Sequence, residues 1–502
     1  MKGVVAAGHP LSAEAGASVL REGGNAVDAA VAAVLASFAV ESPLTGFGAG
    51  GYMMVAAPGE RPVLIDFFVA APGLDGNTRH TELVPVPVRF DAATEQTFYV
   101  GPASCGIPGT AAGLVAALER FGSMPLAELA APAVALAREG APVNAQQAYI
   151  LDILAPIHDR LLGTRELYGP GGVQLLEGDV FRFGDLAEAL ERFGAEGAEP
   201  FYRGETAAAI SDFILENGGT IGRRDLATYE ALERRPIAAP FRGTEVLTNP
   251  PPSSGGILIA YCLGLLERLG PRSGAEQLVA AMSAANDLRD LEFAESLYEE
   301  GVETGVLDSG GLDLAAADLL GSTTHISVFA ADGSCASVTC SNGSGSGVLV
   351  PGTGVILNNM LGEEDLNPLG FHKIAPGRRV PSMMAPTMVL RDGAVEMVLG
   401  SAGSNRIRSA ILQTVVRAVE QGLPVERAIE APRLHFEEGT IQAEPGIDEL
   451  SLELLEAAGT PVARWPQINL FFGGVQAVAR DPRTGALSGG GDPRRGGAVA
   501  IA

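Results

Sequence analysis

Hydrophobic residues follow a helical period in most of the first two thirds of the chain. Residues 11–40 form two alanine-rich stretches interrupted at Gly23-Gly24, and Asn25 is placed to cap the second. Glycine commonly ends helices, and an asparagine directly before an apolar run is a favoured N-cap. Residues 107–235 repeat the pattern, with proline and glycine at the ends of the apolar stretches. We therefore predict helices in both regions, with a hairpin at 52–68 between them.

The pattern changes after residue 322, where apolar and polar residues alternate around short turns. Three pairs of such stretches surround Asp-Gly, Asp-Gly and Pro-x-x-Gly turns, and a helical stretch separates the second pair from the third. The pairs read THISVFA-ADGS-CASVTC, PTMVL-RDG-AVEMVLG and GVQAVA-RDPRTG-ALSG, and the helix reads RIRSAILQTVVRAVEQG. Hairpins join antiparallel strands, so these pairs favour antiparallel α/β layers over a doubly wound parallel sheet.

Composition and charge narrow the class of protein. A chain of 502 residues exceeds the usual size of a single core, and 47% hydrophobic residues with 65 glycines indicate a large layered body with many tight turns. There are 34 Lys and Arg against 60 Asp and Glu, a formal net charge of -26. That charge repels a phosphate backbone and an anionic membrane surface, and no apolar stretch is long enough for a membrane span. We expect neither nucleic acid nor membrane as a partner.

Motifs for metals, nucleotides and disulfides are missing or out of context. The 4 cysteines include no C-x-x-C pair and no H-E-x-x-H or comparable spacing occurs, so we expect no metal and no disulfide framework. GFGAGG at 46–51 matches a dinucleotide fingerprint, but it follows a helix and precedes a strand, the reverse of the required order. The N-terminus lacks the apolar run of a signal peptide. We expect a cytoplasmic protein, or a secreted or periplasmic one whose signal has been removed.

Two threonines open the first alternating stretch of the C-terminal third. Thr323, His325 and Ser327 fall on one face and apolar residues on the other, a pattern that a solvated edge strand would also show. Threonine becomes a good nucleophile when its own free α-amino group acts as the base, which requires cleavage of the preceding bond, here Ser322-Thr323. The glycine-rich turn at 400–406 offers backbone N–H groups for an oxyanion, and no G-x-S-x-G motif of serine hydrolases occurs.

Ten motifs occur in order along nearly the whole chain. They are GHPLSAEAGASVLREGGNAVDAAVAA, GFGAGGYMMV, GIPGTAAGLVAALERFGSMPLAELAAPAVALA, ENGGTIGRRDLATYE, PPPSSGG, TTHISV, NNMLGEEDLNP, PTMVLRDG, GSAG and GDPRRGG. In this order they resemble the γ-glutamyltransferase (glutathione hydrolase) family of N-terminal nucleophile hydrolases. The resemblance implies an α+β fold, a four-layer αββα sandwich with two antiparallel sheets between helical layers, and it implies no cofactor. It also implies a precursor that cleaves itself into a large subunit, 1–322, and a small subunit, 323–502, which together form one intertwined domain.

The resemblance also assigns roles to individual residues. Thr323 would attack an amide carbonyl and form an acyl-enzyme, from which water or an amine takes the acyl group. Ser341 stands where the family has a threonine that hydrogen-bonds the nucleophile, and Gly403 and Ser404 correspond to the glycine pair of the oxyanion hole. The pair Asn358 and Asn359 precedes the acidic segment that would hold the substrate's α-amino group, and Asn359 is assigned to that site. Within the segment Glu363 is aligned with the amino-binding residue, with Glu364 and Asp365 as alternatives. Ser382 is assigned to the substrate's α-carboxylate.

Three ligands of that α-carboxylate are replaced in this chain. Phe68 stands in place of the family's arginine, Met383 in place of a second serine, and Gly343 in place of an asparagine. Leaving a buried carboxylate without its charged partner costs about 2 to 5 kcal/mol of binding. We therefore predict that γ-glutamyl compounds are poor substrates, or that another cation meets the carboxylate. The candidates for that cation are Arg378, Arg379 and Lys373.

Three functional interpretations follow. The main one is a γ-glutamyltransferase-like amide hydrolase. Its loop from Asn359 to Ser382 is shorter than in family members with a lid, so the site is more open to water and hydrolysis is favoured over transfer. The first alternative is an amidase or acylase for substrates without the glutamyl α-carboxylate, and the second is an uncleaved, non-catalytic homologue. The resemblance leaves open whether the two subunits assemble further. Among the histidines, His325 is predicted to be structural and His9 to fix a helix start, while His372 and His435 receive no partner.

Overall fold

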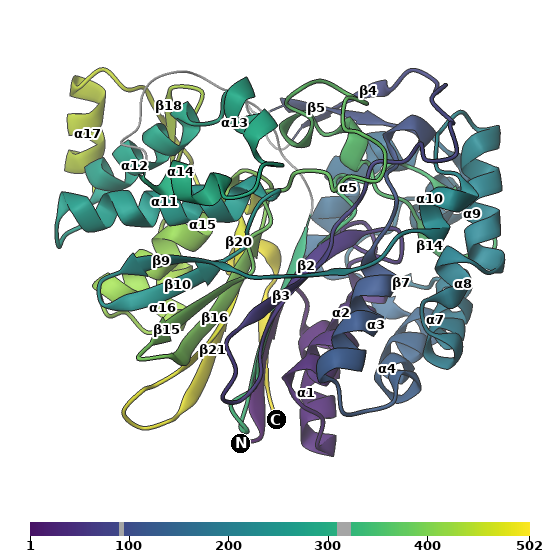
Figure 1. The fold of residues 1–502 in the computed structure, drawn as a ribbon, viewed down its shortest axis with the longest axis horizontal. Coiled ribbons are helices and arrows are strands. Elements are labelled where there is room, and N and C mark those ends of the chain that lie inside the picture. Colours follow the sequence, from purple (N-terminus) through teal and green to yellow (C-terminus); the bar gives the residue numbers. More distant parts are fainter. Residues whose placement is uncertain (90–94, 309–322) are drawn as a thin grey trace.

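The protein is built from two antiparallel β-sheets stacked face to face between layers of helices (Figure 1). The computed structural model describes residues 1–89, 95–308 and 323–502. The predicted αββα sandwich is confirmed. The first sheet has seven strands, in the order β22 (Ala498–Ile501), β1 (Gly3–Ala7), β11 (Thr324–Ala330), β12 (Cys335–Ser341), β2 (Gly50–Ala56), β3 (Val63–Phe67) and β8 (Leu232–Arg234). The second has six, in the order β21 (Leu487–Gly491), β20 (Gly474–Arg480), β16 (Ala394–Ala402), β15 (Thr387–Arg391), β10 (Thr244–Thr248) and β9 (Ile237–Phe241).

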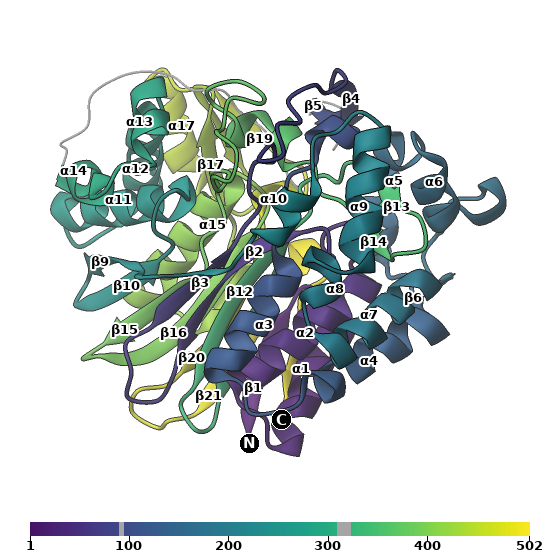
Figure 2. The same ribbon diagram turned by 45° about the vertical axis from the view of Figure 1, so that its right-hand side comes forward.

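Helices cover the outer face of each sheet (Figure 2). α1 (Pro10–Glu22), α2 (Ala26–Val40) and α3 (Thr110–Phe121) pack on the first sheet. α4 (Leu126–Glu139) packs outside α2, and α7 (Gly184–Glu196) packs on α4. The second sheet carries α11 (Ser254–Leu269), α15 (Arg406–Val415) and α16 (Val425–Glu430), and α12 (Ala275–Asp287) packs on α11. The other helices are α5 (Ala145–His158), α6 (Leu162–Tyr168), α8 (Glu199–Tyr202), α9 (Glu205–Glu216), α10 (Arg223–Ala227), α13 (Leu291–Ser296), α14 (Val302–Asp308) and α17 (Glu449–Ala457).

Short strands form small sheets at the edges of the sandwich. They are β4 (Val84–Arg89) with β5 (Glu95–Val100), β6 (Ala141–Pro142) with β7 (Val180–Phe181), β13 (Leu349–Val350) with β14 (Val355–Ile356), and β17 (Leu434–Glu437), β18 (Thr440–Ala443) and β19 (Val462–Arg464).

The predicted caps and hairpins explain why these elements form where they do. Asn25 accepts hydrogen bonds from the N–H groups of Val27 and Asp28, and Asp28 accepts from the N–H of Asn25, which completes a capping box at the start of α2. All of α2 is buried between the first sheet and α4, as its continuous run of apolar residues requires. The hairpins β2–β3, β11–β12, β15–β16 and β20–β21 all form as predicted.

Strands from both sides of residue 322 are interleaved in both sheets. In the first, β11 lies between β1 and β12, and β12 pairs with β2. In the second, β10 from the first part of the chain pairs with β15 from the second part. The N- and C-termini lie side by side because β1 and β22 are neighbours (Figure 1). Neither part of the chain could complete a sheet without the other.

The polar face of β11 is buried, so the alternative of a solvated edge strand is wrong. β11 lies inside the first sheet, and each of its residues is buried. Its polar side chains face the second sheet, where the hydroxyl of Ser327 donates to the carbonyl of Gln476 at 3.0 Å. His325 bonds Thr339 on the neighbouring strand at 2.7 Å. Polar residues are stable here because their hydrogen bonds are made across and within the sheets.

In the part of the chain that the structure describes, no helix has both the length and the apolar character needed to cross a membrane.

Candidate active site

Thr323 lies directly before β11, opposite the end of β12. The register pairs Thr324 with Cys340, which places Thr323 beside Ser341. The Thr323 hydroxyl donates a hydrogen bond to the Ser341 hydroxyl oxygen at 3.3 Å, and the same oxygen accepts the N–H of Gly343 at 2.9 Å. Antiparallel pairing thus brings together two hydroxyls that are 18 residues apart in the sequence. Ser322, the other half of the predicted cleavage site, lies outside the described residues.

A cavity opens beside Thr323, and we call it the catalytic cavity. Most of the predicted site residues line it, although they come from distant parts of the chain. Two predicted residues, Asn359 and Gly403, lie behind its wall. Predicted residues in the wall are Phe68, Thr323, Ser341, Glu363, Ser382, Met383 and Ser404, and further wall residues are Gly343, Met360, Asp365, Leu366, Met384 and Ile407.

The turn between β16 and α15 has a left-handed backbone at both positions predicted for the oxyanion hole. Gly403 has a φ of 117° and Ser404 a φ of 48°, both in the region that favours glycine. Ser404 adopts this conformation while its hydroxyl donates to the Asp365 carboxylate at 2.8 Å. Replacement of the family's second glycine by serine is therefore compatible with the turn, and the hydrogen bond to Asp365 holds it beside the catalytic cavity.

Two carboxylates, Glu363 and Asp365, line the catalytic cavity, whereas Glu364 does not. Glu363 is buried and accepts the N–H of Ser344 at 2.8 Å. Its burial, followed by the nearby charge of Asp365, raises its pKa well above the usual value. A cationic group in the cavity would offset both effects and favour ionisation. The pair is therefore suited to an ammonium group, in agreement with the predicted role of Glu363.

The predicted asparagines support this acidic side. Asn359 donates to the Ser344 hydroxyl at 2.6 Å and hydrogen-bonds the Glu363 carboxylate, so it holds the loop that carries Ser344 against Glu363. Asn358 instead donates to the carbonyls of Gly48 and Gly106, at 2.8 and 3.0 Å. Asn358 thus ties the loop to the first sheet.

The opposite side of the catalytic cavity is apolar. Phe68 is fully buried and its ring stacks on Tyr52 with 5.4 Å between centroids. The Met383 sulfur accepts a hydrogen bond from Ser254 at 3.4 Å. These side chains cover the place where the family would present cationic and hydroxyl ligands to a carboxylate.

None of the three candidate replacement cations lines the catalytic cavity. Arg379 pairs with Asp66 at 3.2 Å and its guanidinium stacks over Tyr229. Arg378 lies over the Tyr298 ring. Asp66 and Tyr229 hold Arg379 outside the catalytic cavity, so it is not placed to meet a substrate carboxylate there.

The histidines have structural surroundings. Burial lowers the pKa of His325 to about 3, so its ring is neutral at physiological pH and holds Thr339 and Ser327. His9 caps α1 by accepting the N–H of Leu11, as predicted. His435 bonds Ser409 and Glu437, and His372 stacks on His80.

The described part of the chain contains no group of three or more His, Cys, Asp or Glu side chains that could hold a metal ion. All four cysteines are free and buried.

Sequence reasoning missed two buried charged residues near the nucleophile. Glu41 accepts a hydrogen bond from the hydroxyl of Thr324 at 3.0 Å, and burial raises its pKa to about 7. Arg495 lies close to Gly403 and lines a second cavity that Thr323 also lines. Glu41 could have been noticed because it is a charged residue at the end of the apolar run of α2. Arg495 was harder to identify, because GDPRRGG contains two adjacent arginines and does not show which one lies near the nucleophile.

Comparisons with known proteins give matches over nearly the whole chain. The family model described as gamma-glutamyltranspeptidase matches residues 12–502. The chain is 33% identical to an acylase proenzyme of Pseudomonas sp. (strain SE83), covering 97% of this chain and 91% of the relative. It is 32% identical to the glutathione hydrolase proenzyme of Escherichia coli (strain K12), covering 98% and 90%. The crystal structure of a cephalosporin acylase from Bacillus halodurans superimposes with a TM-score of 0.85 at 25% identity, covering 100% and 96%.

Proposed function

Because the chain belongs to the gamma-glutamyltranspeptidase family of N-terminal nucleophile hydrolases, we propose that Thr323 is the nucleophile of an amide hydrolase and acyltransferase that processes itself. The observation that carries the proposal is the hydrogen bond from Thr323 to Ser341 at the wall of the catalytic cavity, with Ser404 in the same wall. Nucleophile, orienting hydroxyl and oxyanion turn are thus gathered at one place.

Self-cleavage comes first in this proposal. The Thr323 hydroxyl attacks the carbonyl carbon of Ser322, the peptide C–N bond breaks, and its nitrogen takes up a proton to become the free α-amino group of Thr323. Water then hydrolyses the resulting ester. The products are a large subunit, 1–322, and a small subunit, 323–502, which remain one folded body because their strands are interleaved.

Catalysis then uses the new α-amino group as the base. It takes the proton of the Thr323 hydroxyl as the oxygen attacks the substrate carbonyl, and the N–H groups of Gly403 and Ser404 stabilise the oxyanion. The leaving amine receives the proton as the C–N bond breaks. Water, or a second amine, releases the acyl group from Thr323 in the reverse sequence of proton transfers. We expect hydrolysis to exceed transfer because the loop before Ser382 is short.

Both γ-glutamyl amides and other acyl amides fit parts of this site. Glu363 and Asp365 suit the α-amino group of a γ-glutamyl donor such as glutathione. Phe68 and Met383 favour the second candidate, an acylase for amides without an α-carboxylate, because they present an apolar wall. Both activities use the same nucleophile, and they differ in what the acyl group carries.

A denaturing gel and the intact mass of the purified protein test self-cleavage. Purified wild type should show two fragments that meet at Ser322-Thr323, and T323A should remain a single full-length chain without activity. The non-catalytic alternative would be supported by an uncleaved wild type. Two fragments in T323A would exclude Thr323 as the nucleophile of cleavage.

The substrate class is tested with the same cleaved enzyme on a γ-glutamyl anilide and a butyryl anilide. The double variant F68R/M383S should raise kcat/KM for the γ-glutamyl compound by about 10-fold or more, because it restores a charged partner and a hydroxyl. It should lower kcat/KM for the butyryl compound, because the apolar wall that contacts the butyryl group is lost from the cavity. If both substrates responded alike, the apolar wall would have no part in selecting the acyl group.

A further inference from the structure

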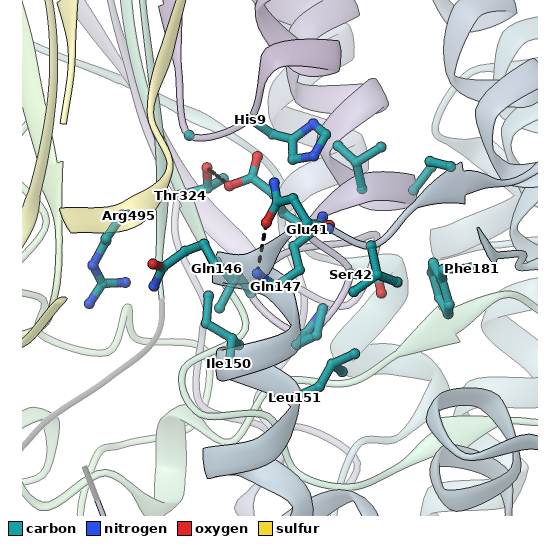
Figure 3. Close-up of a pocket in the computed structure, with 18 of the residues that line it drawn as sticks. His9, Glu41, Ser42, Gln146, Gln147, Ile150, Leu151, Phe181, Thr324 and Arg495 are labelled. Atoms are coloured by element: carbon teal, nitrogen blue, oxygen red, sulfur yellow. Dashed lines mark hydrogen bonds between the residues drawn. The ribbon is translucent and has the colours of Figure 1, made fainter. Parts of the chain in front are cut away.

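A second cavity also borders Thr323, and Figure 3 shows residues of its wall. It is bounded by the end of α2, the start of α5 and the beginning of β11. Its walls are mainly apolar, with Leu44, Ile150, Leu151 and Phe181 among them. Thr323 lines both cavities. A substrate bound across Thr323 could therefore place one half in each.

Two hydrogen-bond donors in this wall lack an acceptor. Nε of Arg495 and Nε2 of Gln146 are buried, and neither has a partner among the residues that the structure describes. The Arg495 side chain is only 9% exposed, and its Nη2 reaches the Leu470 carbonyl at a long 3.4 Å. Both side chains lie on the same side of the cavity in Figure 3. A buried donor without an acceptor costs about 1 to 3 kcal/mol, which a bound ligand could recover.

The charge in this wall favours an anion. Arg495 keeps a pKa of about 10 despite its burial, so it is cationic at neutral pH. Glu41 also lines the cavity, but its carboxylate is occupied by the hydroxyls of Thr324 and Ser12, and no ion pair within 4.0 Å joins it to Arg495 in the described structure. His9 is neutral because burial lowers its pKa to about 4. Below pH 7, where Glu41 is mostly protonated, Arg495 is therefore the charged group available to a ligand.

We propose that the second cavity binds the amine half of the amide substrate, and that Arg495 and Gln146 hold a carboxylate on that half. This rests on the proposed function. The scissile carbonyl must lie between the Thr323 hydroxyl and the turn at Gly403 and Ser404, so the acyl chain occupies the catalytic cavity. The acidic pair of Glu363 and Asp365 there disfavours an anion.

The substrate class that follows is an N-acyl compound whose amine half combines an apolar body with a carboxylate. N-acyl derivatives of apolar amino acids, of short peptides and of carboxylated arylamines belong to it. The apolar body would contact Leu44, Ile150 and Phe181, and the carboxylate would reach Arg495 and Gln146. The same site would select the acceptor amine in acyl transfer, because acceptor and leaving amine occupy the same position relative to Thr323.

Paired substrates with one acyl group and two amines test the assignment. The amines are 4-aminobenzoate and 4-methylaniline, each joined to a γ-glutamyl and to a butyryl group. Wild type should favour the benzoate over the neutral amide by about 10-fold or more in kcat/KM, as expected for a charge-assisted contact. Q146L should reduce this ratio by about 5-fold and R495Q should bring it close to one. Q421L, a matched change at an exposed glutamine, should keep the wild-type ratio.

Direct binding separates this proposal from the proposed function. Calorimetric titration of cleaved wild type and Q146L with 4-aminobenzoate needs no turnover, and Q146L covers the case in which R495Q does not fold. Binding of 4-aminobenzoate that weakens in Q146L supports the site, even if neither amide is hydrolysed. Failure to hydrolyse either amide would exclude the γ-glutamyl and butyryl groups as acyl donors and would leave the binding result unaffected. Hydrolysis without a carboxylate preference, or a preference that both variants retain, would overturn the assignment of Arg495 and Gln146 and leave the nucleophile in place.

Discussion

At the scale of single residues, the surroundings of Thr323 decide what its hydroxyl can do. Its hydrogen bond to Ser341 sets the direction of the hydroxyl, and Ser341 is itself held by the N–H of Gly343. The neighbouring Thr324 is held by the buried carboxylate of Glu41. Each of these contacts fixes the start of β11, where the proposed nucleophile is located.

Loss of the Ser341 hydroxyl should slow the reaction. S341A removes the acceptor of the Thr323 hydrogen bond, worth about 0.5 to 1.5 kcal/mol, so kcat should fall by about 2- to 10-fold while KM changes little. S341T keeps a hydroxyl and should retain most of the wild-type rate. Steady-state kinetics of the cleaved proteins measures this. An unchanged kcat in S341A would show that the Ser341 hydroxyl does not orient the nucleophile.

Glu41 should make stability depend on pH. Burial raises its pKa to about 7 in the folded protein, above the value of 4.5 that is usual for an exposed glutamate, so the folded state binds the proton more tightly. As pH rises from about 4.5 to 7, the unfolded state loses this proton first and gains stability relative to the folded state. E41Q cannot ionise. Between pH 5 and pH 8 it should therefore gain about 2 kcal/mol of unfolding free energy relative to wild type.

Urea unfolding of wild type and E41Q at the two pH values measures this difference. Comparing the two proteins cancels the contribution of the buried histidines, whose lowered pKa values act in the opposite direction. If the difference in unfolding free energy between wild type and E41Q were the same at pH 5 and pH 8, Glu41 would have an ordinary pKa.

At the scale of elements, the two sheets approach each other closely where β11 crosses β16. The ring of His325 lies over Gly400, where an added Cβ would come within 2.2 Å of the ring. The hydroxyl of Ser337 on β12 donates to the carbonyl of Leu399, next to Gly400, at 3.0 Å. Glycine at 400 thus allows a polar layer to pack between two sheets, and the turn that contains Gly403 follows directly on the same strand.

A methyl group at this crossing should push the sheets apart. G400A should cost about 1 to 3 kcal/mol of unfolding free energy, the usual range for overpacking a core. G184A is a control, because its Cβ would meet no atom within 4 Å, and it should change stability little. The double variant G400A/H325A should be less destabilised than the sum of the single variants, since the clash is removed. Strict additivity in urea unfolding would show that the two positions do not interact.

At the scale of the whole molecule, cleavage before Thr323 would cut the connection between strands but not the sheets. β11 would still lie between β1 and β12, and β15 would still pair with β10. Two stretches of chain that share both sheets and their cores cannot separate without exposing most of the apolar interior.

The cleaved protein should therefore behave as one particle until it is denatured. Size-exclusion chromatography should give a single peak with both subunits in every fraction, and a denaturing gel of that peak should show them apart. Residues 323–502 expressed alone should be insoluble or unfolded, because β11 and β15 would lack neighbours on one side. Elution of the two fragments at different volumes under native conditions would contradict the intertwined architecture.

Much of the fold and many of the site residues could be predicted from the sequence because those signals are local or depend on order. Hairpins β11–β12 and β15–β16 follow from alternation and an Asp-Gly turn, and the cap at Asn25 follows from its place before an apolar run. The order of motifs indicated the family, and with it Thr323, Ser341 and the turn at Gly403 and Ser404.

Contacts between distant residues were decided only by the tertiary structure. Arg379 and Asp66 are 313 residues apart in the sequence, and their pairing removes Arg379 as a ligand for the substrate. The hydrogen bond from Ser404 to Asp365 and the place of Arg495 beside the nucleophile also depend on how the sheets stack. Periodicity shows which face of a strand is polar, but it cannot show whether that face meets water or another sheet. The polar face of β11 is buried because the second sheet covers it and satisfies its hydrogen bonds.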